Sequence, residues 1–195
     1  MISLAKPAAS TIEAFLAGQA RREPSYPEVG ASRDRPPAGY AVDHNRIQLG
    51  EGREAFERAS AAIRGWAMFP RPWTEIHPAG APIETGTAVA VLVHLFGLWW
   101  LNACRIVYVI DEPRHFGFAY GTLPGHAESG EERFSVEWRE DDTVWYDLLA
   151  FSRPRLWLAR LGHPVTRRVQ RRFARESKAA MLEASREMPE HPARL

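Results

Sequence analysis

The sequence predicts an α+β fold in which a curved antiparallel sheet grips a long C-terminal helix. From Gly86 to Phe151, β-branched and aromatic runs alternate with turn residues, which is the pattern of an antiparallel meander. A strand and an amphipathic helix precede this region, and a long helical pattern follows it. With 195 residues, 45% of them hydrophobic, the chain can bury one sizeable core. A sheet wrapped around a helix encloses a cavity, which is where an apolar ligand is expected.

The chain is expected to form a single domain in three parts. These are an N-terminal helical and proline-rich arm, the sheet-and-helix region and a frayed tail, at residues 1–38, 39–186 and 187–195. Within the arm, residues 10–22 have helical spacing, and either Ser10 or Thr11 can cap the helix.

Residues 23–40 contain four prolines and two glycines, so they cannot form a regular element. They are either a linker or an arm laid over the body of the protein. The aromatic ends of the segment, Tyr26 and Tyr40, favour the arm.

The remaining elements follow from periodicity and turn signals. Residues 40–50 form a strand, and residues 52–66 form a helix whose apolar residues recur at helical spacing. Proline-rich residues 69–82 separate this helix from the meander. The strands of the meander are expected at residues 87–95, 104–110, 115–121, 132–139 and 143–151. The final helix begins near Val165, and Pro164 suits its first turn.

The composition narrows the setting of the protein. Cys104 is the only cysteine, so no internal disulfide exists, and its place in an apolar run predicts a small buried side chain. The N-terminus lacks the basic start and apolar run of a signal peptide, so a reducing, cytoplasmic location is expected. The histidines show no ligand spacing such as HExxH, so neither a metal nor a cofactor is expected.

Residues 88–103, "AVAVLVHLFGLWWLNA", are apolar enough to raise the question of a membrane. The segment falls short of the roughly 18–20 apolar residues of a spanning helix, and its valines favour strands. We therefore expect two buried strands joined by an aromatic turn. Trp99 and Trp100 near that turn would favour a homodimer or a membrane contact if exposed, and neither if buried.

Residues 115–138, "HFGFAYGTLPGHAESGEERFSVEW", hold the candidate site. A loop over residues 121–133 is long for a hairpin, and long polar loops on rigid scaffolds often carry function. His126 titrates near neutral pH, with Glu131 and Glu132 as acidic neighbours, so these three are the catalytic candidates. Arg133 can hold a carboxylate in a bidentate fork. The alternative is a rigid turn whose charges pair with one another.

Strand alternation places Glu132 on the same face as Phe134 and Trp138. If that face lines the cavity, a carboxylate points into an apolar pocket and needs a partner, for which Arg105 is a candidate. The alternative is a hydrated Glu132 at the mouth of the strand. The predicted ligand-binding residues are Tyr120, His126, Glu132, Arg133, Phe134, Trp138 and Arg105. Val136, Trp145 and Tyr146 are further candidates for the cavity wall, of which only part can face inward.

Residues 153–178 carry a concentration of positive charge with Glu176 as their only acidic residue. The cations are Arg153, Arg155, Arg160, Arg167, Arg168, Arg171, Arg172, Arg175 and Lys178. They are either the solvated back of the helix or a weak contact surface for an anionic membrane. No RNA- or DNA-binding signature is present, so no specific nucleic acid partner is expected.

Several runs together resemble the DUF1990 domain family. They are "YPEVGAS" (26–32), residues 39–69, "GFAYGTLPGHAESGEERFSVEW" (117–138) and "AFSRP" (150–154). The chain departs from the family pattern at Ala127, where a proline is expected after the histidine. The resemblance implies a START-like helix-grip fold, as in the birch-pollen allergen, and no particular reaction.

The leading hypothesis is therefore a helix-grip protein that binds a small apolar or aromatic ligand in a cavity between sheet and helix. One alternative is an enzyme on the same scaffold that uses His126 with Glu131 or Glu132 as acid and base. The other is a module that contacts a membrane surface or a partner through the Trp99–Trp100 turn and the arginine-rich helix.

Overall fold

Every strand pairing in the sheet is antiparallel. The structure, a computed structural model, describes residues 1–154 and 163–186. In these residues the strands are β1 (Ile2–Ser3), β2 (Ala41–Glu51), β3 (Thr74–His77), β4 (Ala88–Leu95), β5 (Leu98–Glu112), β6 (His115–Thr122), β7 (Glu128–Trp138) and β8 (Thr143–Pro154). The helices are α1 (Ala9–Gln19), α2 (Gly52–Arg64), α4 (His163–Ala184) and the short η1 (Ala31–Arg33). The strand order is β2-β8-β7-β6-β5-β4-β3, and β1 pairs with β5.

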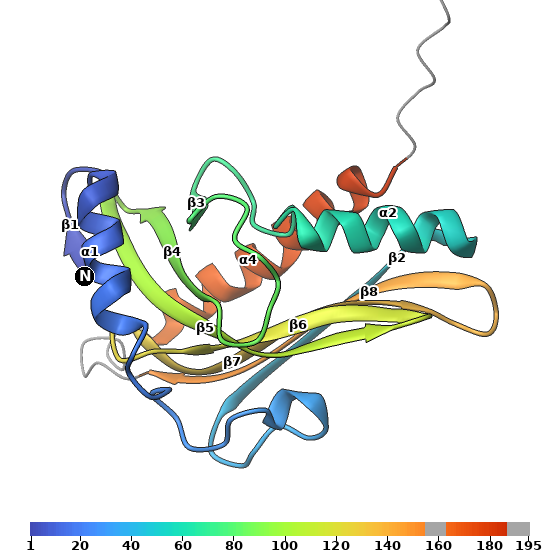
Figure 1. Ribbon diagram of the computed structural model, residues 1–195, viewed down its shortest axis with the longest axis horizontal. Helices are drawn as coiled ribbons and strands as arrows, with labels where there is room; N and C mark the ends of the chain where they lie inside the picture. Colours follow the sequence, from blue (N-terminus) through green and yellow to red (C-terminus); the bar gives the residue numbers. More distant parts are fainter. Residues whose placement is uncertain (155–162, 187–195) are drawn as a thin grey trace, which may run out of the picture.

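The predicted α+β architecture is confirmed: a curved antiparallel sheet runs beneath a long C-terminal helix (Figure 1). The sheet has an inner face, covered by α2 and α4, and an outer face, crossed by the N-terminal segment. Alternation along each strand assigns its side chains to these two faces. The predicted tail at 187–195, together with Arg155 and Arg160, lies outside the described residues.

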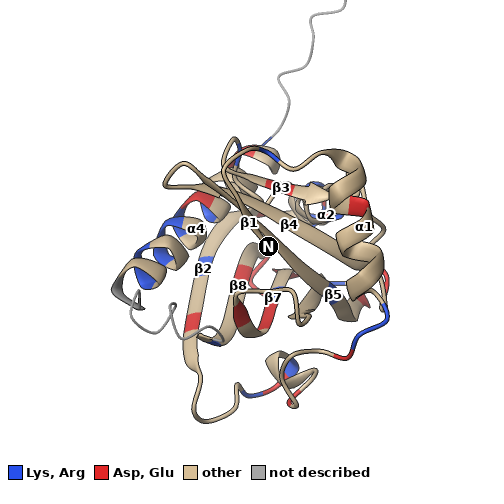
Figure 2. Cartoon of the chain, turned by 90° about the vertical axis from the view of Figure 1, so that its left-hand side faces the viewer, with Lys and Arg blue, Asp and Glu red and all other residues tan. Residues whose placement is uncertain are grey.

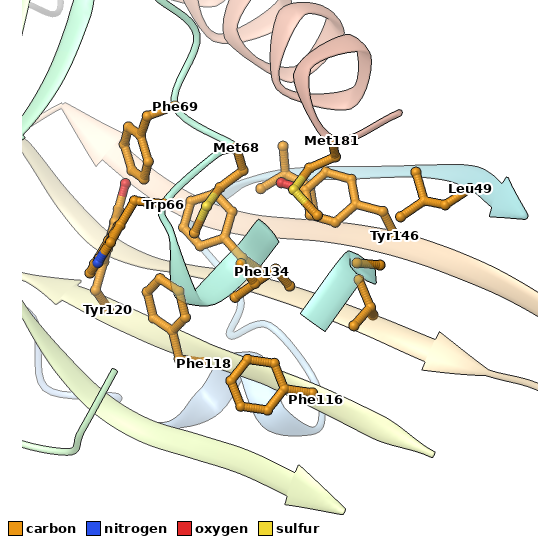
Figure 3. Packing of buried hydrophobic residues seen from close by; sticks show 14 of the residues in the cluster. Leu49, Trp66, Met68, Phe69, Phe116, Phe118, Tyr120, Phe134, Tyr146 and Met181 are labelled. Atoms are coloured by element: carbon orange, nitrogen blue, oxygen red, sulfur yellow. The ribbon is translucent and has the colours of Figure 1, made fainter. Parts of the chain in front are cut away.

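The main core lies between the inner face and the two helices. Aromatic rings from β6 and β7, among them Phe118 and Phe134, pack against Phe69 and Met68 from the segment after α2 (Figure 3). Met181 of α4 closes the core from above. A smaller cluster lies on the outer face of β4 and β5, where α1 covers Ala90, Leu92 and Leu101 with Ile12. Burial of the apolar stripe on each helix thus fixes it to one face.

The structure corrects several details of the predicted elements. The short strand β3 lies within the proline-rich residues 69–82, to which the sequence pattern assigned no element. Helix α1 begins at Ala9, and no side chain caps it, so the predicted cap at Ser10 or Thr11 is wrong. The apolar segment at 88–103 forms parts of β4 and β5, as predicted. No helix in the described residues is both long and apolar enough to cross a membrane.

The tryptophans of the β4–β5 turn are neither exposed, which would favour a homodimer or a membrane contact, nor fully buried. Trp99 is half-buried because it stacks on His94, with ring centroids 4.3 Å apart, and Lys6 lies over its ring. Trp100 is half-buried and pairs with Ile2 of β1. The exposed residue of this turn is Phe96, at 76% exposure.

Candidate functional site

A cavity of about 200 Å³ lies between the inner face of the sheet and helix α4. Helix α4 contributes Val169, Phe173 and Ala174, and the sheet contributes apolar side chains that include Val91 and Leu148. These residues face one another because the sheet curves and α4 crosses its open side. The cavity exceeds the roughly 150 Å³ that suffices for a benzene molecule, so it can hold an aromatic ring system.

The polar centre of this cavity is a buried acid with a hydroxyl beside it. Tyr120 of β6 and Glu132 of β7 are directly paired in the sheet, and both line the cavity. The Tyr120 hydroxyl donates to the Glu132 carboxylate over 2.7 Å. Of the two alternatives left open for Glu132, the structure has the inward carboxyl group, with Tyr120 rather than Arg105 as its partner.

Burial controls the protonation of this pair. Glu132 keeps accessible surface because it faces the cavity, but protein atoms surround it. Desolvation raises the pKa of Glu132 to about 7; the Tyr120 hydrogen bond opposes this rise and the negative charge of Asp43 adds to it. The same burial raises the pKa of Tyr120 well above its usual value. Near neutral pH, Glu132 can therefore donate a proton as a neutral acid or accept one as a carboxylate.

Asp43 of β2 lies at the rim of the cavity, and sequence reasoning missed it. Both oxygens of its carboxylate accept hydrogen bonds from the Arg167 guanidinium of α4. Arg167 also donates to the side chain of Gln170, which in turn donates to Ser152 of β8 over 3.2 Å. This chain of contacts ties α4 to the strands beside it. Alternation along residues 41–51 would have turned Asp43 inward, in register with the inward-facing Ile47.

Asn102 is a second missed residue of the cavity. It is 8% exposed within an otherwise apolar strand, and its side-chain oxygen accepts from the backbone of Ala127 over 3.3 Å. An amide in an apolar run was the available signal, because a buried amide needs a partner.

His126 lines the same cavity from the connection between β6 and β7. Its Nδ1 accepts a hydrogen bond from the backbone of Glu128 over 2.9 Å, which fixes the ring against its own turn. That connection comprises only residues 123–127. The prediction of a long loop over 121–133 is therefore wrong: its second half belongs to β7, which extends the hairpin.

Glu131 engages the arm on the outer face, opposite to Glu132. Its carboxylate accepts from the Tyr26 hydroxyl over 2.6 Å, from the Gly30 amide over 2.7 Å and from the Ser32 amide over 2.9 Å. The Ser32 hydroxyl makes a fourth bond to it. The proline-rich segment is thus an arm over the sheet, in agreement with the interpretation of Tyr26 and Tyr40. Glu131 also lines the cavity, as His126 does, but the four hydrogen bonds from the arm occupy its carboxylate.

The two arginines predicted to bind ligand are also engaged on the outer face. Arg133 donates to the Ser32 carbonyl and, over 2.9 Å, to the Asp147 carboxylate. Arg105 donates to the carbonyls of Ala20 and Arg22, so it holds the chain between α1 and the arm and does not pair with Glu132. Both residues alternate with inward-facing neighbours, which sends their side chains to the opposite face.

The predicted aromatic wall is only partly at the cavity. Phe134 is fully buried and supports the cavity from below, in contact with Tyr120 and Phe173. Trp138 lies at the far end of β7, stacked on Phe56 of α2, so it does not line the cavity. Among the further candidates, Val136 and Tyr146 are buried in the core, whereas Trp145 packs beneath Arg46.

Within the described residues, no three His, Cys, Asp or Glu side chains are grouped to hold a metal ion. The Cys104 thiol is fully buried, and burial raises its pKa, as expected of a small core side chain. The site therefore combines apolar walls with the Glu132–Tyr120 pair and with further polar residues that include Asp43, Asn102 and His126.

Solved structures share this fold at low sequence identity. The crystal structure of a hypothetical protein from Helicobacter pylori matches with a TM-score of 0.53 and 11% identity, over 76% of this chain and 88% of that one. A protein from Thermus thermophilus matches with a TM-score of 0.52 and 10% identity, over 74% and 97% of the two chains. Human STARD10 matches with a TM-score of 0.49 and 9% identity, over 93% and 80%. The Helicobacter and Thermus matches show that this chain shares their fold.

Sequence relatives match at higher identity. A Deinococcus radiodurans protein named UPF0548 is 39% identical over 199 residues, which span 95% of this chain and 99% of the relative. A UPF0548 protein from Dictyostelium discoideum is 40% identical over 159 residues, 75% of this chain and 74% of the relative. The family model described as a domain of unknown function, DUF1990, matches residues 25–180. The chain therefore belongs to the DUF1990 family.

Proposed function

We propose that this protein binds a small apolar or aromatic molecule in the cavity between the sheet and α4. The observation that carries the proposal is the buried Glu132–Tyr120 pair, which faces a cavity whose other walls are largely apolar. Burying a carboxyl group is costly, and a purely structural core would have an apolar side chain here. A ligand with one polar group recovers part of that cost by hydrogen bonding to the pair.

The size and lining of the cavity restrict the ligand. A volume of about 200 Å³ suits a ligand of up to three rings or a short branched chain. Phe173 and Phe69 offer aromatic faces to a ring. The polar group that meets Glu132 is an amine, a hydroxyl or a carbonyl, because a carboxyl group near its pKa both donates and accepts.

Catalysis at the same site is the second candidate, and the protonation of Glu132 favours it. A carboxyl group with a pKa of about 7 is suited to proton transfer at neutral pH. His126 lines the same cavity and is the second titratable candidate. The test is to incubate the ligand, once identified, with the wild type and with Glu132→Gln. Chemical change by the wild type alone supports catalysis, and an unchanged ligand with both excludes it.

The other expectations remain predictions. A cytoplasmic location rests on the single cysteine and on the N-terminal sequence. The boundary at residue 38 between the N-terminal arm and the sheet-and-helix region is likewise a prediction, and so is a homodimer. A weak membrane contact would use Phe96 and the arginine-rich helix, and binding to anionic vesicles at low salt tests it.

The experiment that tests ligand binding is a titration with N-phenyl-1-naphthylamine, an uncharged aromatic dye that fluoresces in apolar surroundings. Ala150 lines the cavity directly opposite Glu132 in the sheet, so Ala150→Phe fills the space beside the acid. The wild type should bind the dye, and Ala150→Phe should weaken binding at least about tenfold, since the ring displaces the dye's contacts. Ala38→Phe, at an exposed position of the arm, is the matched control. Absence of binding to the wild type, or equal binding to Ala150→Phe, would contradict the proposal.

A further inference from the structure

A second concave site lies beside the cavity, between the edge strand β2 and helix α4. This groove has a volume of about 370 Å³. Its strand side is formed by residues 42–45, and its helix side by Gln170, Arg171, Ala174, Arg175 and Lys178. We call it the basic groove. Figure 2 shows the Lys and Arg residues that follow one another along α4 beside β2.

The charges of the basic groove are not balanced by its own carboxylates. Arg171, Arg175 and Lys178 are spaced four and three residues apart, so they lie on one face of α4 over about 10 Å. In the described part of the chain, neither Arg171 nor Lys178 forms an ion pair, whereas Arg175 pairs with Glu176 of the same helix at 3.4 Å. The carboxylate in the lining, Asp43, is already neutralised by two hydrogen bonds from Arg167.

On helix α2, arginines form ion pairs with glutamates of the same helix. On α2, Arg53 lies 3.9 Å from Glu57, and Arg58 lies 3.7 Å from Glu54. On α4, Arg172 and Arg175 both pair with Glu176. Within the described residues, Arg171 and Lys178 on the groove side have no such partner. The uncompensated charge is therefore concentrated at the groove, which favours an anion there.

The basic groove adjoins the ligand cavity. Four residues line both: Asp43 and Asn45 from β2, and Gln170 and Ala174 from α4. The two spaces are thus neighbours across the seam where α4 meets β2. A molecule that occupies the cavity and extends past this seam places its outer end among the three cations.

We propose that the basic groove binds an anionic group of the same ligand whose apolar body occupies the cavity. This inference rests on the proposed ligand binding and adds the chemical class: an apolar or aromatic molecule with a carboxylate, sulfonate or phosphate at one end. Two arginine side chains recognise such oxyanions through paired N–H donors, and the lysine adds a third charge. The free phosphate ion shares this chemistry, and the experiment separates it from a ligand's own anionic group.

The test compares two dyes that share one ring system. N-phenyl-1-naphthylamine is uncharged, and 8-anilinonaphthalene-1-sulfonate adds a sulfonate. In the double variant Arg171→Gln/Arg175→Gln, the affinity for the sulfonate dye should fall at least about tenfold, and that for the uncharged dye less than about twofold. The control is Arg21→Gln/Arg35→Gln, which removes the same charge at two exposed positions on the outer-face side of the chain and should change neither affinity. Added salt should weaken the binding of the sulfonate dye to the wild type and leave the binding of the uncharged dye unchanged.

Each result has a distinct meaning. Equal losses for both double variants, or equal affinities of the wild type for the two dyes at low salt, would overturn the inference and leave the cavity as a binding site. Failure of the uncharged dye to bind the wild type would instead overturn the proposed function. If inorganic phosphate stabilises the wild type but not Arg171→Gln/Arg175→Gln, while the two dyes bind equally, the groove serves a free anion and the inference is overturned.

Discussion

Replacing Glu132 by glutamine should remove most of a pH dependence of stability that arises within the cavity. The pKa of Glu132 in the folded protein is about 7, compared with 4.5 for a free glutamate. The folded state therefore binds this proton more tightly than the unfolded state does. The stabilisation that follows is fully present below pH 4.5 and is lost as the pH rises through about 7.

The size of the effect follows from the shift. At about 1.4 kcal/mol per pKa unit, the rise corresponds to about 3.5 kcal/mol in the free energy of unfolding. About 2.5 kcal/mol of this is lost between about pH 5 and about pH 8, because the unfolded state is already mostly ionised at the lower value. In Glu132→Gln, the new amide has no charge to bury, while its side-chain oxygen can still accept from the Tyr120 hydroxyl.

The assay is urea unfolding of the wild type and Glu132→Gln at about pH 5 and about pH 8. Relative to Glu132→Gln, the wild type should lose about 2.5 kcal/mol of its free energy of unfolding between about pH 5 and about pH 8. Glu140→Gln, an exposed carboxylate in the β7–β8 turn, should follow the wild type. A difference between wild type and Glu132→Gln that stays constant with pH would show that Glu132 is hydrated and would refute the reasoning.

Three further predictions concern other parts of the molecule. Glu131→Ala should destabilise the protein by about 3 kcal/mol in urea unfolding, because a buried carboxylate with four donors is lost. Tyr26→Phe, which removes one of these donors, should lower the stability by about 1.5 kcal/mol. Equal stability of the wild type and both variants would argue against an anchored arm. Arg167→Gln should lower the free energy of unfolding by about 1 kcal/mol. Adding Asp43→Asn to this variant should cause little further loss, because the two substitutions remove the same ion pair. Additive losses would contradict this coupling. Cys104 should not react with a thiol reagent until urea unfolds the protein, and rapid labelling in buffer would place it at the surface.

Alternation was sufficient to place Glu132, because side-chain direction in a strand has a period of two and needs no knowledge of the rest of the fold. The same rule, applied to its neighbours, assigns Glu131 and Arg133 to the outer face. Their partners were beyond reach of the sequence, since Tyr26 and Ser32 lie about 100 residues away and belong to an irregular segment.

The glycines explain why the β6–β7 connection was overestimated. Gly130 was interpreted as a loop residue and Gly121 as the boundary between strand and loop, yet both lie within strands. A Cβ on Gly121 would overlap with the ring of Tyr26, and one on Gly130 would overlap with the carbonyl of Phe151. Glycine in a strand can thus mark the close approach of another segment, and only the packed structure distinguishes this from a turn.

For helix α4, the sequence likewise predicted the element but not the role of its charged side chains. Its periodicity and its excess of arginines were visible in the sequence, which left open whether the charge was a solvated back or a binding surface. The outcome depends on the neighbouring strand: Arg167 pairs with Asp43, whereas Arg171 faces the groove beside β2. Long-range packing decides between these roles.

The most direct test of the central claim is native mass spectrometry of the freshly purified wild type, followed by denaturing extraction and identification of what is released. The account predicts a small, largely apolar or aromatic molecule at close to one per chain, absent from Ala150→Phe prepared in parallel. A wild type that carries nothing and takes up nothing from a lipid and metabolite extract, or a molecule retained equally by Ala150→Phe, would contradict it.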